Sequence, residues 1–253
     1  MTSLKAVIFG AIGSVAEVAD LERQAYNAAF KQAGLDWKWS AVAYKELLKT
    51  DGGEERIRAF RDAVPDRADV DDKAIEKLHA AKKAGVVELI AQSKLTPRPG
   101  VKELMDACLA ADVKLAWCAA SSTDSVKALN KALVKQLPLK DLSATVTLEA
   151  ADASGNPAKG YLECLQELGL KASEVVAVED TPFGVAAAKE AGIFTVATPG
   201  ESAAGQDFSE ADLVVTSLSS VTLEELQNLL GQTKDVAFAD SADSADSGKS
   251  GNS

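Results

Sequence analysis

Lys5-Ala-Val-Ile-Phe9 is a short apolar run that ends at two glycines, Gly10 and Gly13. An apolar run of this length before glycine predicts a buried strand that stops in a tight loop. From residue 17 to about residue 94 no further strand signal appears, and the apolar spacing becomes helical instead. The first strand is therefore followed by an all-helical insert, with helices expected over residues 17–34, 41–49, 54–63 and 71–93.

The phrase Leu95-Thr-Pro-Arg-Pro-Gly100 ends this insert, and strands then alternate with helices. Such alternation predicts an α/β fold with a doubly wound parallel sheet. We expect a core of residues 1–16 and 95–231, interrupted by a helical cap of residues 17–94. The expected strands are 114–119, 144–148, 175–178, 194–197 and 213–215, and the expected helices are 101–111, 125–137, 158–169, 184–192 and 223–230.

The composition excludes several functions. The 253 residues include 27 basic and 38 acidic side chains, a net charge of −11 that disfavours nucleic-acid binding. No apolar stretch is long enough for a membrane span. Three scattered cysteines suit neither a disulfide framework nor a zinc site, so a reducing compartment is expected. No signal peptide is visible at the N-terminus.

Residues 232–253 have a different composition, with Ala-Asp-Ser repeated three times over residues 239–247. Such a segment buries too little apolar surface to fold alone, which predicts a solvated acidic tail. The alternative is a docking segment anchored by its only apolar patch, Val236-Ala-Phe238.

Several phrases, in this order and spacing, resemble the haloacid dehalogenase superfamily and, within it, the CbbY-like and phosphoglycolate-phosphatase-like proteins with a helical cap. The resemblance covers about residues 5 to 230. It is carried by Val7-Ile-Phe9 with Gly13-Ser-Val15, Asp20-Leu-Glu-Arg-Gln-Ala-Tyr-Asn27, Gly52-Gly53 with Glu55-Arg-Ile57, Arg98-Pro-Gly-Val101 and Val178-Glu-Asp-Thr181.

The resemblance implies catalytic groups that this chain lacks. Relatives carry a nucleophilic aspartate and an acid–base aspartate at positions occupied here by Gly10 and Ile12. Neither residue can attack phosphorus or transfer a proton. The family's phosphate-binding hydroxyl and lysine align with Ala119 and Asn156. Nearby Ser121 or Ser122, and Lys159, could replace them only from shifted positions.

Only the acidic pair Glu179-Asp180 of the family's magnesium site remains. Magnesium prefers a fuller set of oxygen ligands, so no cofactor is expected, although weak Mg²⁺ binding at this pair stays open. Alternatively, Asp180 caps the helix that starts near Pro182.

The cap also lacks residues that the family uses to bind substrate. Glu54 stands where relatives carry a substrate-facing lysine, and Glu22 stands where they commonly carry histidine. Arg56 matches the family motif and is a weak candidate for phosphate binding. Its alternatives are a surface cation or the i,i+4 partner of an acidic neighbour.

Three other residue types have ordinary explanations. His79, the only histidine, is expected to be a surface or packed helix residue, and Cys118 a small buried residue rather than a nucleophile. Trp37 and Trp39 either pack inside the cap or form a docking surface.

Loss of several cooperating groups removes catalysis, while the core phrases remain intact. We therefore hypothesise a pseudophosphatase that acts as a structural or interaction subunit with protein partners in a larger assembly. The family resemblance suggests a plastid stroma or a cytoplasm. The alternatives are a magnesium-dependent sugar-phosphate phosphatase with a rearranged site, or a non-catalytic binder of a phosphorylated metabolite.

Overall fold

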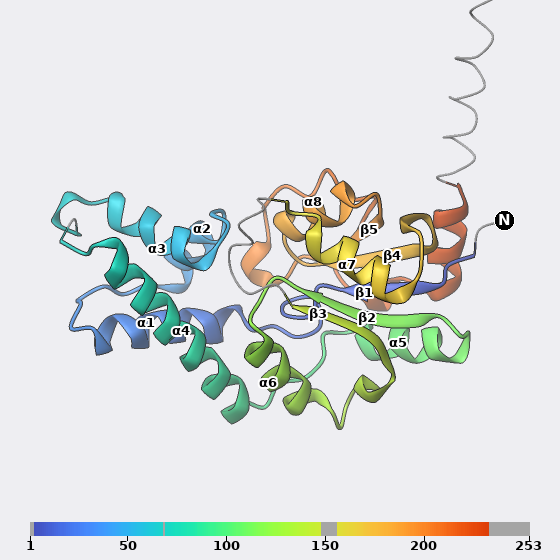
Figure 1. The fold of residues 1–253 in the computed structure, drawn as a ribbon, viewed down its shortest axis with the longest axis horizontal. Helices are drawn as coiled ribbons and strands as arrows, with labels where there is room; N and C mark the ends of the chain where they lie inside the picture. Colours follow the sequence, from blue (N-terminus) through green and yellow to red (C-terminus); the bar gives the residue numbers. More distant parts are fainter. Residues whose placement is uncertain (1–2, 68, 148–155, 233–253) are drawn as a thin grey trace, which may run out of the picture.

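The computed structural model describes residues 3–67, 69–147 and 156–232. Its centre is a six-stranded parallel sheet of order β3-β2-β1-β4-β5-β6. The strands are β1 (Ala6–Phe9), β2 (Lys114–Ala119), β3 (Leu142–Thr147), β4 (Val175–Glu179), β5 (Phe194–Ala197) and β6 (Leu213–Val214). The predicted α/β class with a parallel sheet is confirmed (Figure 1).

Helices cover both faces of the sheet because the strand side chains alternate between two apolar clusters. Val7 and Phe9 of β1 belong to a cluster with α5 (Val101–Ala110), α6 (Thr123–Leu133) and the helix of residues 223–232. Ala6 and Ile8 face α7 (Lys159–Leu168) and α8 (Pro182–Glu190) on the other side. All four residues of β1 are fully buried, as its continuous apolar run predicts.

The chain between β1 and α5 forms four helices, which lie beside the sheet domain in Figure 1. They are α1 (Ala19–Gln32), α2 (Ala41–Leu47), α3 (Gly53–Asp62) and α4 (Asp72–Gln92). These helices enclose an apolar cluster of their own, and α4 also packs on α6 of the core. The expected all-helical insert is therefore present, whereas the domain boundaries at residues 16, 94 and 231 remain predictions.

Trp37 and Trp39 are both buried in this cluster, which confirms that they pack inside the cap. Trp39 stacks on Tyr44 at 5.7 Å between ring centroids, and Asn27 hydrogen-bonds both its backbone N–H and its carbonyl. The alternative of a tryptophan docking surface is therefore wrong, since burial leaves neither ring available to a partner.

Most element limits differ from the sequence prediction by one or two residues, and helix α6 ends four residues early, at Leu133 instead of residue 137. Helix α6 begins at Thr123, two residues early, because the Ser122 hydroxyl caps it. Strand β3 begins at Leu142, also two residues early, and residue 148 of the predicted strand lies outside the described residues, as does the predicted tail beyond residue 232. Among the helices that the structure describes, none has both the length and the apolar character needed to cross a bilayer.

Candidate functional site

The carboxyl ends of β1 and β4 bring Gly10 and the acidic pair Glu179-Asp180 together. Gly10 donates its backbone N–H to the Val178 carbonyl at 2.9 Å, directly before that pair. In a parallel α/β sheet this edge is where ligands ordinarily bind. The vacated family positions and the remaining carboxylates therefore share one location, as the sequence motifs imply.

The Glu179 carboxyl group occupies the space that a side chain at position 10 would need. A Cβ atom added to Gly10 would lie 2.5 Å from Glu179 Oε2 and 2.7 Å from Ser14 Oγ. Glu179 is only 6% exposed, and the buried Tyr161 hydroxyl donates a hydrogen bond to its Oε1. A Cβ at Gly184 would also overlap this carboxyl group. The space beside Gly10, where the family resemblance implies a nucleophile, is thus filled by a neighbouring side chain.

Asp180 is held beside the loop that follows β1. The Ser14 hydroxyl donates to Asp180 Oδ1 at 3.0 Å, and Ser14 is itself fully buried. Gly13, with φ +92°, lies against the same carboxyl group, and an added Cβ would overlap it. Both the backbone conformation and the close approach therefore require glycine here.

Burial keeps protons on this pair of carboxyl groups. Burial, followed by the Asp180 charge, raises the pKa of Glu179 to about 8. Burial also raises the pKa of Asp180 to about 7, although the Ser14 hydrogen bond and the Arg98 charge act to lower it. A protonated carboxyl group is a poor ligand for a divalent cation and a poor base near neutral pH.

These residues do not fit magnesium as a resident cofactor. Gly10 and Ile12 supply no carboxylate, and Glu179 and Asp180 each accept a hydrogen bond from a protein hydroxyl. In the described parts of the chain, no three His, Cys, Asp or Glu side chains gather closely enough to hold a metal ion. The pair alone offers fewer free carboxylate oxygens than a resident magnesium ion requires.

The predicted role of Asp180 as the helix cap is wrong. Thr181 is the N-cap of α8, and its side chain accepts a hydrogen bond from the Gly184 N–H at 3.1 Å. Asp180 lies one residue earlier and faces Ser14 instead. Asp is the stronger N-cap of the two residue types, so the cap preference favoured Asp180, whereas in the structure its carboxyl group bonds Ser14.

Two of the three shifted replacements, Ser122 and Lys159, have structural roles in this arrangement. Ser122 accepts from the Ser125 N–H at 3.2 Å, so its hydroxyl caps α6 three residues after Ala119. The Asn156 side chain accepts from the Ala158 N–H at 2.9 Å, and Lys159 lies 4.0 Å from Glu163 on its own helix. Neither Ala119 nor Asn156 carries the charge or hydroxyl that the family uses.

Arg98 ties the loop after β1 to the loop after β5, a role that the sequence motif did not reveal. Its guanidinium donates to the carbonyls of Gly13, Thr198 and Pro199 at 3.1, 2.7 and 3.0 Å. Its Nε also lies 3.4 Å from Glu17 Oε1. The Arg98 side chain is only 9% exposed, so it holds the two loops together from the protein interior.

Both alternatives offered for Arg56 in the cap are wrong. Arg56 is partly buried over the Tyr44 ring at 5.8 Å, and it donates to the carbonyls of Leu47 and Thr50, both at 3.1 Å. It therefore closes the loop between α2 and α3, rather than serving as a surface cation or a helical i,i+4 partner. These two donors of Arg56 already bond backbone carbonyls, so they are not free to bind a phosphate, and phosphate binding by Arg56 stays a prediction.

Sequence reasoning missed a buried ion pair inside the cap. Lys82 donates to Glu22 Oε1 at 2.6 Å and lies 4.9 Å from the centroid of the Tyr26 ring. Burial alone would raise the pKa of Glu22, but the charge and hydrogen bond of Lys82 outweigh burial and lower it. Lys82 follows the period of the buried face of α4 (Ile75, Leu78, His79, Val86, Ile90), and this pattern could have identified it.

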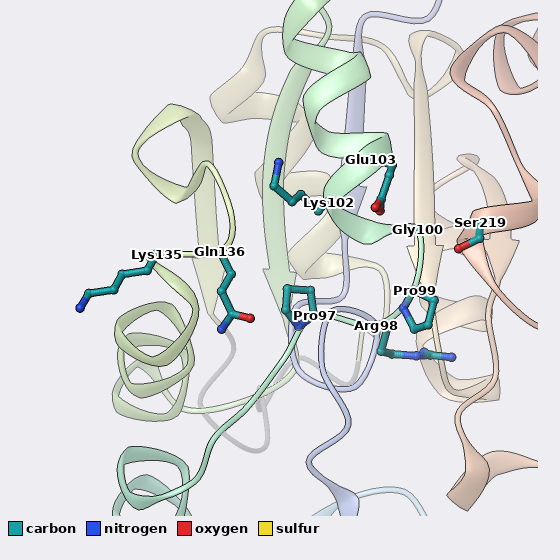
Figure 2. Close-up of a pocket in the computed structure, with 9 residues that line it drawn as sticks. All are labelled: Pro97, Arg98, Pro99, Gly100, Lys102, Glu103, Lys135, Gln136 and Ser219. Atoms are coloured by element: carbon teal, nitrogen blue, oxygen red, sulfur yellow. The ribbon is translucent and has the colours of Figure 1, made fainter.

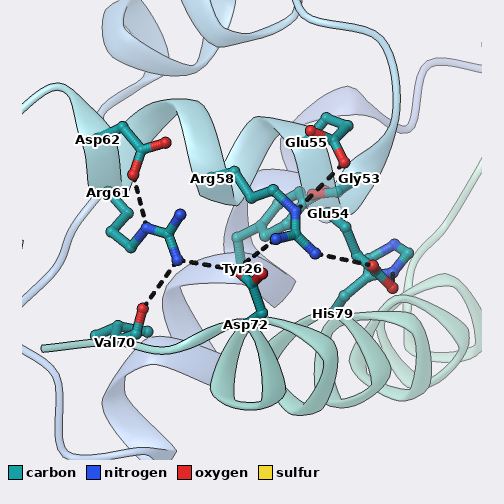
Figure 3. Close-up of polar contacts among 10 residues, drawn as sticks. All are labelled: Tyr26, Gly53, Glu54, Glu55, Arg58, Arg61, Asp62, Val70, Asp72 and His79. Atoms are coloured by element: carbon teal, nitrogen blue, oxygen red, sulfur yellow. Dashed lines mark hydrogen bonds and ion pairs between the residues drawn. The ribbon is translucent and has the colours of Figure 1, made fainter. Parts of the chain in front are cut away.

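Glu54 and His79 form part of a polar network between α3 and α4 (Figure 3). Glu54 Oε1 lies 3.1 Å from His79 Nδ1, and Arg58 bridges the Glu54–Glu55 turn to Asp72. Burial lowers the pKa of His79, although Glu54 acts to raise it. His79 is a packed helix residue, as predicted, and Glu54 faces this network.

Cys118 and Cys164 are buried neighbours between β2 and α7. Their mutual hydrogen bond, followed by burial, raises the pKa of the Cys118 thiol far above its usual range, and Cys164 donates to the Trp117 carbonyl at 3.3 Å. A buried thiol of this kind is not a nucleophile. This confirms Cys118 as a small buried residue.

Comparison with known proteins identifies the family. The model of the haloacid dehalogenase-like hydrolases matches residues 4–192. Protein CbbY of Rhodobacter capsulatus is 37% identical over 227 residues, covering 89% of this chain and 99% of that protein. A CBBY-like protein of Arabidopsis thaliana is 33% identical over 201 residues, covering 77% of this chain and 63% of that protein.

Solved structures agree with this assignment. CbbY from Rhodobacter sphaeroides in complex with phosphate has a TM-score of 0.74 at 30% identity, covering 85% of this chain and 95% of that one. A mutant of the same protein was solved with xylulose-1,5-bisphosphate. The chain therefore belongs to the haloacid dehalogenase-like hydrolase family, with CbbY proteins among its relatives.

Proposed function

We propose that this chain is a catalytically inactive member of its family, a pseudophosphatase that serves as a structural or interaction subunit of a protein assembly. One observation carries the proposal: the Glu179 carboxyl group, held by Tyr161, fills the space beside Gly10 where a nucleophile would stand. Catalysis by phosphoryl transfer through a carboxylate needs that position to hold an aspartate.

The other vacated positions support the same proposal. Ile12 has no proton to transfer, and Ala119 and Asn156 provide no hydroxyl or ammonium group for a phosphoryl oxygen. When catalytic groups act together, removing any one of them abolishes most of the rate enhancement. A site that lacks four such groups is therefore expected to retain little catalytic activity. The buried core and cap remain well packed, which supports a role for the fold itself.

Two alternatives are weaker on this geometry. A phosphatase with a rearranged site would have to use Glu179 and Asp180, whose raised pKa values oppose a carboxylate nucleophile. A binder of phosphorylated metabolites would need cations in the cleft, but Arg56 is bonded to carbonyls and Glu54 replaces the family lysine. The setting we propose, plastid stroma or cytoplasm, rests on family likeness alone.

A phosphatase assay with magnesium tests the proposal. The probe is xylulose-1,5-bisphosphate, the compound named in the relative's structure, with a generic aryl phosphate beside it and Rhodobacter CbbY as the positive control. We expect no magnesium-dependent phosphate release above background. Turnover that disappears in Asp180→Asn would establish the rearranged phosphatase instead. Thermal stabilisation by the bisphosphate without turnover would establish the metabolite binder.

The subunit role needs its own measurement. The native protein is isolated at low salt, chemically crosslinked in the extract, and the crosslinked residue pairs are identified by mass spectrometry. Reproducible crosslinks from defined surface residues to one protein partner support the role. A native protein that runs as a monomer without crosslinks contradicts it, whatever the outcome of the phosphatase assay.

A further inference from the structure

One exposed helix face is strongly basic in a chain of net charge −11. Lys127, Lys131 and Lys135 recur every four residues along α6 and just beyond it, and all three are exposed. Spacing of four residues places them in one row on a helix. Residues 125–140 contain four lysines and no acidic residue. We call Lys127, Lys131 and Lys135 the lysine face.

The lysine face is poorly neutralised by its neighbours. Lys127 lies 3.8 Å from Asp124, a pair in which both side chains are more than two thirds exposed. Lys131 and Lys135 have no acidic partner within the described residues. The opposite side of α6 is buried through Val126, Leu129 and Leu133, so the helix is firmly held and its basic side points outward.

A cavity of about 510 Å³ adjoins the end of the lysine face. Lys135 forms one wall, and Pro97, Pro99, Lys102 and Ser219 form others (Figure 2). Ser219 lies just before the C-terminal helix of residues 223–232. The cavity thus lies between the end of α6 and the loop that precedes the C-terminal helix.

We propose that the acidic repeat of this chain's own C-terminal segment, residues 239–247, docks on the lysine face of α6. The repeat carries Asp240, Asp243 and Asp246 with no basic residue between them. Its charge is complementary to the lysine face. The proposal is independent of whether the chain is catalytic.

The length of the chain is sufficient for this contact. The C-terminal helix of ten residues is about 15 Å long, so Gln232 lies within about 30 Å of Ser219 at the cavity. Asp240 is eight residues beyond Gln232 and reaches about 26 Å, and Asp246 reaches about 46 Å. Asp246 therefore exceeds the distance of about 30 Å to Ser219 by about 16 Å and can reach the Lys135 end of the lysine face, whereas Asp240 falls about 4 Å short of that upper limit.

Because the repeat and the lysine face belong to one chain, the repeat can bind even though each Asp–Lys ion pair is weak. Exposed ion pairs contribute little one at a time, but a short tether raises the local concentration of the repeat to about the millimolar range. Because the contact is electrostatic and exposed, salt weakens it. The docked repeat would therefore cover the basic face at low ionic strength and dissociate from it at high ionic strength.

Fluorescence anisotropy of a terminal label tests the proposal on the full chain. Ser253→Cys is labelled with a maleimide dye, since the native thiols are buried and the pKa of Cys108 is raised to about 12. We expect the anisotropy at about 20 mM salt to exceed that at about 500 mM salt, because the docked repeat is restrained only when charges are unscreened.

Three matched variants decide where the repeat binds. Replacing the lysine face by glutamine (Lys127→Gln, Lys131→Gln, Lys135→Gln) should remove the salt-dependent difference, whereas the same three positions changed to arginine should keep it. The control changes three exposed cap lysines, Lys31, Lys73 and Lys77, to glutamine and should behave as the parent chain. An equal loss in the control, or no salt dependence in the parent, overturns the proposal.

Carbodiimide crosslinking tests directly whether the acidic repeat contacts the lysine face. At low salt the Asp240, Asp243 or Asp246 carboxylate should form amides with the lysine face, detected by mass spectrometry. A mixture of ordinary and ¹⁵N-labelled chains distinguishes contacts within one chain from contacts between chains. Amides found only on other lysines, or only between chains, contradict docking on the chain's own α6.

Discussion

Gly10 and Glu179 share one small volume, so a single methyl group at position 10 should disturb the site. We predict that Gly10→Ala lowers the free energy of unfolding by about 1–3 kcal/mol, the usual cost of overpacking. The reason is that its Cβ would lie 2.5 Å from Glu179 Oε2 and 2.7 Å from Ser14 Oγ. Urea denaturation measures the change. Gly231→Ala, with no atom within 4 Å, is the control and should lose no stability.

A double-mutant cycle identifies Glu179 as the cause. In a Glu179→Ala background the space beside Gly10 is empty, and Gly10→Ala should then cost at least about 1 kcal/mol less than in the parent chain. An unchanged cost would mean that the backbone at position 10, rather than the Glu179 side chain, resists substitution.

The two raised carboxyl pKa values predict a stability that falls with increasing pH. The folded pKa of Glu179 is about 8 against an ordinary 4.5, and that of Asp180 is about 7 against 3.8. Between these limits the folded chain holds more protons than the unfolded chain, so the free energy of unfolding decreases as pH rises from about 4 to 8.

Urea midpoints measured from pH 5 to pH 8.5 check this dependence. Glu179→Gln keeps the shape of the side chain without its charge and should flatten the decrease, while leaving the pH 5 value close to that of the parent. The lowered pKa of His79 acts in the opposite direction but is common to both chains, so an equally steep pH dependence in the parent and Glu179→Gln would contradict the raised pKa of Glu179.

At the residue scale, the family resemblance indicated catalytic groups that this sequence lacks, and this stays a prediction, but it did not indicate which side chain lies in the space beside Gly10. The vacancy at Gly10 and Ile12 follows from alignment with a motif. The position of the Glu179 carboxyl group depends on Tyr161, 18 residues away, and on a second close approach at Gly184. Such contacts arise only when β4, α7 and α8 pack together.

Among the elements, the cap depends on a charge pair that joins α1 to α4. Glu22→Ala should lower the free energy of unfolding by about 3–5 kcal/mol, because it leaves the Lys82 ammonium buried without a partner. The double replacement Glu22→Leu with Lys82→Met removes both charges and should recover most of that loss. Thermal and urea unfolding compare the single and double variants.

The control for this prediction is an exposed pair of the same types. Lys49 and Glu46 lie 2.5 Å apart with both side chains more than half exposed, and Glu46→Ala should change stability by less than about 1 kcal/mol. Equal effects at Glu22 and Glu46 would contradict the assignment of Lys82 as a buried charge.

The elements themselves were largely predictable because their signals are local. Strand β2 and β5 coincide with their predicted ranges, and the cap helices differ by one or two residues at their ends. The errors came from caps: Ser122 starts α6 earlier than its apolar period suggests, and Thr181 rather than Asp180 starts α8. Several polar residues stood near each end, and periodicity does not choose among them.

At the scale of the whole molecule, Arg98 joins three distant segments through carbonyls of Gly13, Thr198 and Pro199. Arg98→Lys should lower the free energy of unfolding by about 2–4 kcal/mol, because a single ammonium group cannot replace a forked donor that is almost fully buried. Arg58→Lys, within the partly exposed network of α3, is the control and should cost less than about 1 kcal/mol. Comparable losses at both positions would contradict this role.

The arrangement of the whole chain was predictable as an architecture but not as a set of contacts. The βα alternation indicated a parallel sheet, and its interruption after β1 indicated the inserted cap. The order β3-β2-β1-β4-β5-β6 and the packing of α4 on α6 depend on contacts between residues far apart in the sequence. Local periodicity carries no information on these pairings.

The central position of β1 has a consequence for synthesis on the ribosome. Strand β1 leaves the ribosome first, yet its two neighbours, β2 and β4, begin only at Lys114 and Val175. The cap helices are complete by Gln92 and contact one another, so they can assemble before β1 has a neighbouring strand with which to pair. A nascent chain of this protein thus carries Ala6–Phe9 without a neighbouring strand until β2 is complete at Ala119, and with one edge unpaired until β4 is complete at Glu179.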